Sequence, residues 1–282
     1  METQRFEAIH VDDGEGNARV VVRAPQTFGR TAFLLLFAAL VVNAAIVLVG
    51  LPNVSRSLTL TYSMNFGDLY DLIARNLDQG NGYRVDANMG LTMLREPGYP
   101  LVLAVVFKLL GYGIQTARAT CVLLTFGAAL ILLRLARKIT GDSTIALTGA
   151  LIFLLYPGVL VAETRAGIEP PFIFAVLLFM LALYSALEKG SLWRYGAAGL
   201  LLGVAVLVRS QALLFPLLLL VYLLVMSKNN SERVKIVLRI AVLGLGALIV
   251  MSPWIIRNYE LVQTYTYGHS CGGRSAGGAL YL

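Results

Sequence analysis

The chain has 282 residues, of which 57% are hydrophobic and only 14% are charged, with a net charge of +7. A soluble domain carries about 25% charged residues, and one of this length needs more polar side chains to cover its surface, so a soluble globular fold is excluded. The positive charge does not indicate nucleic-acid binding either. Lys and Arg stand at the ends of long apolar runs, where they orient membrane spans.

The apolar runs have the length and composition of membrane helices. A hydrocarbon core of about 30 Å needs around 20 apolar helical residues, and every backbone polar group inside it must be satisfied within the segment. Residues 31–51 and 212–226 contain no Asp, Glu, Lys or Arg. The sequence therefore predicts an all-α fold, a polytopic transmembrane helical bundle.

The first part of the chain is predicted to be a cytoplasmic tail over residues 1–30, followed by a span over 31–51 that begins too late for a cleaved signal peptide. An outer loop follows over 52–96. Within it, apolar residues recur at helical spacing over 68–79, which predicts an amphipathic surface helix.

The transmembrane module is predicted to extend over residues 31–256, and a Gly-rich extracytoplasmic tail over 257–282 ends the chain. Beyond the first span, six apolar runs are predicted to cross the membrane: 119–133, 145–161, 171–187, 195–208, 212–226 and 236–256.

Residues 97–110 form a shorter apolar run, bounded by Pro97 and Gly111, that also holds Lys108. Runs of this length are more often re-entrant or interfacial than spanning. If this one does not cross, three basic clusters all fall in the cytoplasm, as the positive-inside rule requires. The sequence thus predicts about seven spans plus one re-entrant or interfacial helix, with the N-terminus inside. The clusters are Arg134, Arg137 and Lys138; Lys189 and Arg194; and Lys228, Arg233, Lys235 and Arg239.

The outer loop carries the densest group of candidate functional residues. Asp68 and Asp71 stand one helical turn apart beside Tyr70, where a carboxylate could act as a general base. The alternative is structural: Asp68 caps the helix and Asp71 is simply solvated.

Two further outer segments carry charges. Glu96 lies at the entry to the short apolar run, and the turn between two predicted spans holds Glu163, Arg165 and Glu169. Charges near membrane depth are costly and are usually paired or functional. The alternative is that Glu163 or Glu169 only neutralises Arg165.

Arg209 and Arg257 each follow directly on a long apolar run. An arginine there can snorkel to the interface. Because outer-face arginines oppose the positive-inside bias, binding of a phosphate is the functional alternative.

The ordered set of motifs resembles the polytopic glycosyltransferases of the GT-C class. More narrowly, residues 31–275 are similar to bacterial relatives of the dolichyl-phosphate-mannose protein mannosyltransferases, glycosyltransferase family 39. The matching motifs are the acidic helix with Tyr70, the Gly-x-Gly-Tyr ending at Tyr83, Arg95-Glu96-Pro97-Gly98-Tyr99-Pro100, the outer acidic turn, Val208-Arg209-Ser210, and the segment from Pro253 to Tyr259.

This resemblance implies a polyprenyl-phosphate-linked sugar donor and a lipid, glycan or protein acceptor at the outer face of a bacterial cytoplasmic membrane. It makes Asp68 the first candidate for the base and Asp71 the second, with Arg209 and Arg257 binding phosphate. The implied substrate-binding residues are Tyr70, Glu96, Glu163, Arg165, Glu169, Arg209 and Arg257. The resemblance requires no cofactor and leaves room for a divalent metal, without a predicted ligand set.

The alternative function is a non-catalytic lipid-carrier binding or flippase-like membrane protein, or an assembly partner. A transporter needs charged residues at mid-membrane depth along its path. The apolar runs of this chain lack them, which favours the enzyme.

Overall fold

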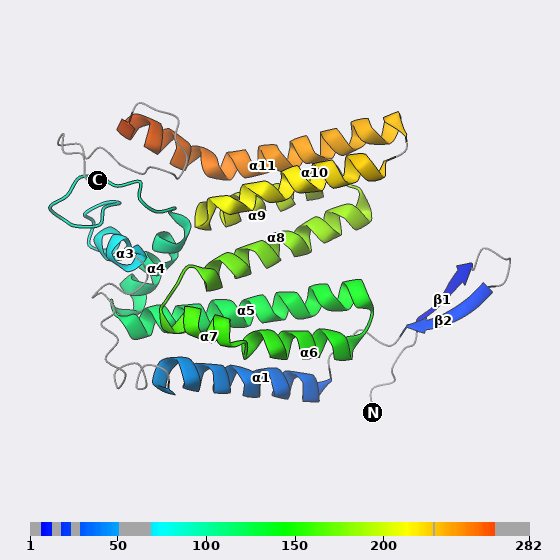
Figure 1. The fold of residues 1–282 in the computed structure, drawn as a ribbon, viewed down its shortest axis with the longest axis horizontal. Helices are drawn as coiled ribbons and strands as arrows, with labels where there is room; N and C mark the ends of the chain where they lie inside the picture. Colours follow the sequence, from blue (N-terminus) through cyan, green and yellow to red (C-terminus); the bar gives the residue numbers. More distant parts are fainter. Residues whose placement is uncertain (1–6, 13–17, 24–28, 51–68, 228, 263–282) are drawn as a thin grey trace.

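The computed structural model describes residues 7–12, 18–23, 29–50, 69–227 and 229–262 (Figure 1). Strands β1 (Glu7–Asp12) and β2 (Ala18–Arg23) form an antiparallel hairpin in which Glu7 pairs with Arg23. The sequence predicted only a polar tail there, so the hairpin is an addition to the predicted fold. Apart from the loop over residues 79–97 and the short connections, the rest of the described chain is helical, as expected for a membrane bundle.

From Gly98 onward the helices follow one another through short connections. The bounds of the described helices are α1 Arg30–Ala45, continued by the π-helix η1 Ile46–Gly50; α3 Tyr70–Asp78; α4 Gly98–Leu110; α5 Ile114–Thr140; α6 Ser143–Leu154; α7 Pro157–Thr164; α8 Glu169–Lys189; α9 Leu192–Val208; the 3-10 helix η2 Ser210–Leu213; α10 Leu214–Met226; and α11 Asn230–Val262.

Four helical segments among the described residues are long and apolar enough to cross a membrane: Arg30–Gly50, Ile114–Thr140, Glu169–Lys189 and Asn230–Leu261. A fifth is added if α6 and α7, which meet at a 43° bend, count as one broken span. Helices α4 and α9 and the pair η2–α10 are apolar but shorter. The protein is therefore a multi-pass membrane protein, and the count of about seven spans stays a prediction.

The long helices lie side by side, with α3 and α4 at one end of the bundle, hereafter the α3 end (Figure 1). The opposite end holds the basic clusters. There Lys138 of α5 pairs with Glu188 of α8 at 3.2 Å, and the Arg239 guanidinium of α11 lies 5.7 Å from the Tyr195 ring of α9. Lys228 lies outside the described residues.

Helix α4 begins and ends at the α3 end. Its first residue, Gly98, packs so closely on the end of α9 that an added Cβ would lie 2.8 Å from the Leu207 carbonyl oxygen. Its last residue, Leu110, is followed within four residues by the start of α5. Both termini of α4 therefore lie at the α3 end of the bundle.

Glycines bring the backbones of α9 and α11 together. A Cβ added at Gly203 would lie 2.7 Å from the Ala247 carbonyl oxygen, and one at Gly246 would lie 2.5 Å from the Gly196 carbonyl oxygen. Small residues at such positions permit close helix packing in membranes. This contact fixes the relative positions of the α9 and α11 ends that carry Arg209 and Arg257.

Helix α1 is tied to the bundle through Asn43, which is fully buried. Its Nδ2 donates to the carbonyl of Leu154 at 2.8 Å and to Glu163 Oε2 at 3.0 Å. Leu154 is the last residue of α6, and the helix is interrupted there until α7 begins at Pro157. A side chain of α1 therefore satisfies a carbonyl that lies at a helix end.

Candidate functional site

Asp71 lies in the first turn of α3 and is only 1% exposed. Its Oδ2 accepts a hydrogen bond from the Tyr112 hydroxyl at 3.1 Å, and its Oδ1 has no hydrogen-bond partner among the described residues. Burial raises the pKa of the Asp71 carboxyl above its ordinary value, and the bond from Tyr112 offsets part of that rise. Asp71 is therefore not the simply solvated carboxylate of the structural alternative. Asp68 lies outside the described residues.

Aromatic rings and a guanidinium surround the start of α3. The Tyr70 ring lies 5.5 Å from the ring of Tyr99 in α4, and the Arg95 guanidinium lies 5.5 Å from the centroid of Tyr70. The Tyr99 hydroxyl donates to the carbonyl of Ala166 at 2.9 Å. The turn between α7 and α8 is thereby joined to α3 and α4.

Glu96 links the start of α4 to the turn after α9. It is 9% exposed, and its Oε1 accepts from the backbone N–H of Ser210 at 3.4 Å. The Tyr83 hydroxyl donates to the carbonyls of Arg95 at 2.9 Å and Glu96 at 3.1 Å. Because Ser210 follows Arg209 directly, Glu96 and Arg209 lie at the same end of the bundle.

Arg209 is half-buried at the C-terminus of α9. Its guanidinium lies 5.8 Å from the Phe172 ring. Within the described part of the chain, that guanidinium has no carboxylate or hydrogen-bonding partner. Whether Arg209 binds phosphate, as the sequence predicted, stays a prediction.

Arg257 is engaged by the protein itself. Its Nη2 donates to the Thr92 carbonyl at 3.2 Å and its Nη1 to Asn258 Oδ1 at 2.9 Å. The guanidinium also lies 5.0 Å from the Tyr83 ring and 4.4 Å from the Trp254 ring. These contacts hold the loop over residues 79–97 against α11, and phosphate binding by Arg257 stays a prediction.

The three charged residues of the second outer turn differ in burial. Glu163 is fully buried and faces Asn43 of α1 rather than the surface. Arg165 and Glu169 are exposed on either side of Ala166, which accepts the Tyr99 hydrogen bond. Arg165 and Glu169 therefore border the α3 end, whereas Glu163 points into the bundle.

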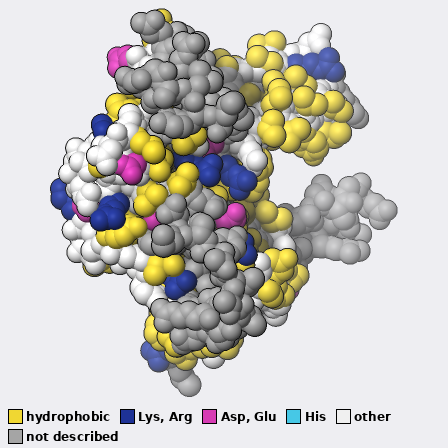
Figure 2. All heavy atoms as spheres, turned by 60° about the vertical axis from the view of Figure 1, so that its left-hand side comes forward, with side chains coloured by type: hydrophobic (Ala, Val, Ile, Leu, Met, Phe, Trp, Pro, Cys, Tyr) yellow, Lys and Arg dark blue, Asp and Glu magenta, His cyan; other side chains and the backbone are white. Residues whose placement is uncertain are grey.

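With the α3 end turned toward the viewer, Lys and Arg side chains lie near the middle of the visible face, with Asp and Glu side chains beside them (Figure 2). In the described part of the chain, no three Asp, Glu, His or Cys side chains gather into a metal-ligand set. The residues that the structure brings to this end are Tyr70, Asp71, Glu96, Arg209 and Arg257, with Arg165 and Glu169 at its border.

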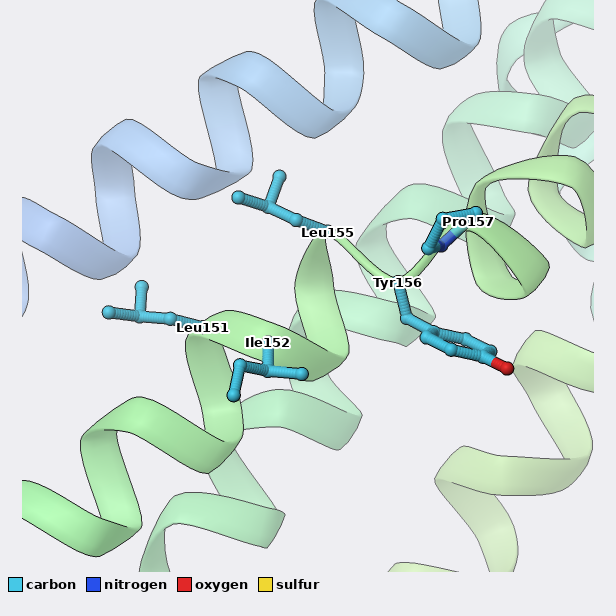
Figure 3. Close-up of a pocket in the computed structure, with 5 residues that line it drawn as sticks. All are labelled: Leu151, Ile152, Leu155, Tyr156 and Pro157. Atoms are coloured by element: carbon cyan, nitrogen blue, oxygen red, sulfur yellow. The ribbon is translucent and has the colours of Figure 1, made fainter.

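A pocket of about 350 Å³ lies elsewhere, at the bend between α6 and α7 (Figure 3). None of its lining side chains is acidic or basic, so it is not the site of the polar chemistry. Its lining residues are Leu151, Ile152, Leu155, Tyr156 and Pro157.

Several residues of the site were not singled out by the sequence. Arg95 and Tyr99 belong to a recognised motif, but their contacts with Tyr70 and Ala166 could not be read from it. Apart from its two glycine neighbours, nothing in the sequence indicated a role for Tyr112. Arg118 stands alone at the start of an apolar run and is buried, with its Nε donating to the Thr164 carbonyl at 2.7 Å.

Comparison with known proteins agrees with the motif resemblance. A family model described as dolichyl-phosphate-mannose-protein mannosyltransferase matches residues 95–256, more than half of the chain. The match contains Glu96 and Arg209, begins after Asp71 and ends just before Arg257. None of the curated proteins and none of the solved structures compared with the chain matches it. The chain belongs to the dolichyl-phosphate-mannose-protein mannosyltransferase family and is a membrane glycosyltransferase of the GT-C type.

Proposed function

We propose that this enzyme transfers a sugar from a polyprenyl-phosphate-type lipid to an acceptor hydroxyl at the α3 end, with Asp71 as general base. The observation that carries the proposal is the environment of Asp71. It is a buried carboxyl with a raised pKa, one oxygen held by Tyr112 and the other without a partner among the described residues. Titratable groups perturbed in this way are typical of functional sites.

In the proposed step, the acceptor oxygen attacks C1 of the sugar and a new glycosidic bond forms. The hydroxyl proton passes to Asp71 Oδ1. The bond between C1 and the phosphate oxygen breaks with inversion, and its electron pair leaves with the lipid phosphate. Arg209 supports this step because an arginine fork matches the phosphate that gains charge. Asp68, three residues earlier, remains the alternative base.

The α3 end is proposed to face the extracytoplasmic side of a bacterial cytoplasmic membrane. The positive-inside rule supports this orientation, because the basic clusters lie at the other end. The proposed crossings are α1, α5, the α6–α7 pair, α8, α9, α10 and α11, with α4 returning to its own side. Helix α9 has 17 residues, about 26 Å at the rise of an α-helix, which is close to the thickness of the hydrocarbon core.

The proposal is tested with the purified protein in liposomes that contain a polyprenyl-phosphate hexose, supplied with lipid, glycan and peptide acceptor fractions in turn. A transferase releases free polyprenyl phosphate in step with a new glycoside. If instead the donor moves between leaflets and its C1–O bond stays intact with every acceptor, the flippase-like alternative is correct. A donor that neither reacts nor moves points to a binding or assembly protein.

A further inference from the structure

We propose that Tyr112 is a positioning residue for Asp71: its hydroxyl holds Oδ2 and leaves Oδ1 as the oxygen that takes the acceptor proton. This inference deepens the proposed function and rests on Asp71 acting as its base. Tyr112 lies neither in a matched motif nor in a helix, but in the link between α4 and α5.

The Tyr112 ring is held from two sides. The ring of Phe107, in the last turn of α4, meets it edge-on with centroids 5.1 Å apart. The Arg75 guanidinium, one turn after Asp71 on α3, lies 5.0 Å from its centroid. The neighbouring Gly111 has a φ of +86°, a conformation in which glycine has no steric cost. Packing of the ring therefore directs the hydroxyl at Asp71.

The Tyr112 donor distinguishes the two carboxylate oxygens. A carboxylate has two equivalent acceptor oxygens and turns easily about its last torsion. The 3.1 Å bond from Tyr112 fixes Oδ2, and Oδ1 is the oxygen without a partner among the described residues. Oδ1 is itself buried, so an acceptor hydroxyl that reaches it meets the oxygen that is still able to accept a proton.

Tyr112 keeps its proton across the working range of pH. Partial burial and the neighbouring Asp71 charge raise the pKa of Tyr112, which is 41% exposed, to about 12, although Arg75 opposes the rise. The phenol therefore faces the Asp71 carboxylate as a hydrogen-bond donor, and donation to an ionised carboxylate lowers the carboxyl pKa. Two further groups lie near Asp71. Tyr99 of α4 interacts with it electrostatically, and the Arg95 guanidinium of the preceding loop contacts the ring of Tyr70, the residue before Asp71.

The first test titrates Asp71 without any substrate. Infrared difference spectra of the full-length protein in micelles follow the protonated carboxyl band that Asp71→Asn removes. In Tyr112→Phe, the midpoint of that band is expected to move up by about one pH unit, a tenfold change in the ionisation constant. The control is Tyr222→Phe, because Tyr222 is exposed on α10, and it should leave the midpoint unchanged. An unchanged midpoint in Tyr112→Phe overturns the inference.

The second test is kinetic. In Tyr112→Phe, kcat is expected to fall about tenfold at a pH below the shifted midpoint while KM for the lipid donor stays constant. Should this variant fail to fold, Arg75→Met removes the cation over the ring and is expected to shift the midpoint in the same direction by less. An active Asp71→Asn refutes the proposed base. An inactive Asp71→Asn with an unaltered Tyr112→Phe profile refutes only the role of Tyr112.

Discussion

Asp71 sets the expected pH dependence of sugar transfer. A general base works in its ionised form, and burial raises the pKa of Asp71 above its ordinary value. Transfer is therefore expected to fall as pH drops through this raised pKa, with a midpoint above the ordinary value of about 3.9 for an aspartate. A pH–rate profile measures this limb. A rate that stays constant down to the ordinary aspartate pKa would show that Asp71 does not titrate in the rate-determining step.

The same burial has the opposite effect on folding. Because the folded state holds the Asp71 proton more tightly than the unfolded state, the contribution of this group to stability is complete below the unfolded pKa. It is lost as pH rises through the raised pKa. The carboxyl thus becomes reactive in the pH range in which its burial costs stability.

Arg209 and Arg257 are expected to respond differently to substitution. Arg209→Gln should raise KM for the lipid donor at least tenfold, because a charge-assisted bond to phosphate is lost, and should leave the melting temperature nearly unchanged. Arg257→Gln should instead lower the stability of the folded protein by roughly 1–3 kcal/mol, because it removes cation–π and carbonyl contacts. Donor titrations and thermal melts of both variants separate the two roles. If both variants raise KM for the lipid donor equally, Arg257 also belongs to the phosphate-binding site.

Among single residues, the sequence predicted those that stand in motifs. It missed those whose role depends on contacts between segments far apart in the chain. Tyr70, Asp71 and Glu96 were identified because acidic and aromatic residues recur there at helical or motif spacing. The role of Tyr112 depends on a bond across 41 residues of sequence, which no local pattern contains. Asn43 is an isolated amide in an apolar run, and its partners come from α6 and α7.

At the level of elements, the contact between α9 and α11 is expected to be sensitive to side-chain size. Gly203→Leu should prevent close packing, because a Cβ there would lie 2.7 Å from the Ala247 carbonyl, and should cost several kcal/mol through displacement of the helices. Gly244→Leu is the matched control on α11, since no atom lies within 4 Å of an added Cβ. Detergent-resistance or melting measurements compare the two variants. Equal stability would mean that the backbones do not approach as closely as the structure shows.

The helical elements were predictable because apolar runs without charges can satisfy their backbones in a membrane only as helices. The boundaries of these helices were less predictable. The predicted run over 145–161 is divided between α6 and α7, because Pro157 cannot continue a helix without a break. The hairpin of β1 and β2 was missed because it lies in a polar tail outside the apolar runs.

For the molecule as a whole, the two ends of the bundle are expected to lie on opposite sides of the membrane. In a background without Cys121 and Cys271, Asp86→Cys at the α3 end should react with a membrane-impermeant maleimide in intact spheroplasts. Thr140→Cys, at the end of α5 beside the basic cluster, should react only after lysis. Both positions are exposed. Labelling of both from the same side would refute the proposed orientation.

The central claim is that Asp71 accepts the proton of the acceptor at the α3 end. Its most direct test compares sugar transfer by Asp71→Asn and by Asp78→Asn, which alters the other end of the same helix α3. We expect Asp71→Asn to lower kcat at least 100-fold, as for loss of a general base, with donor binding and folding retained. We expect Asp78→Asn to keep nearly full activity. Transfer by Asp71→Asn at the wild-type rate would contradict the account.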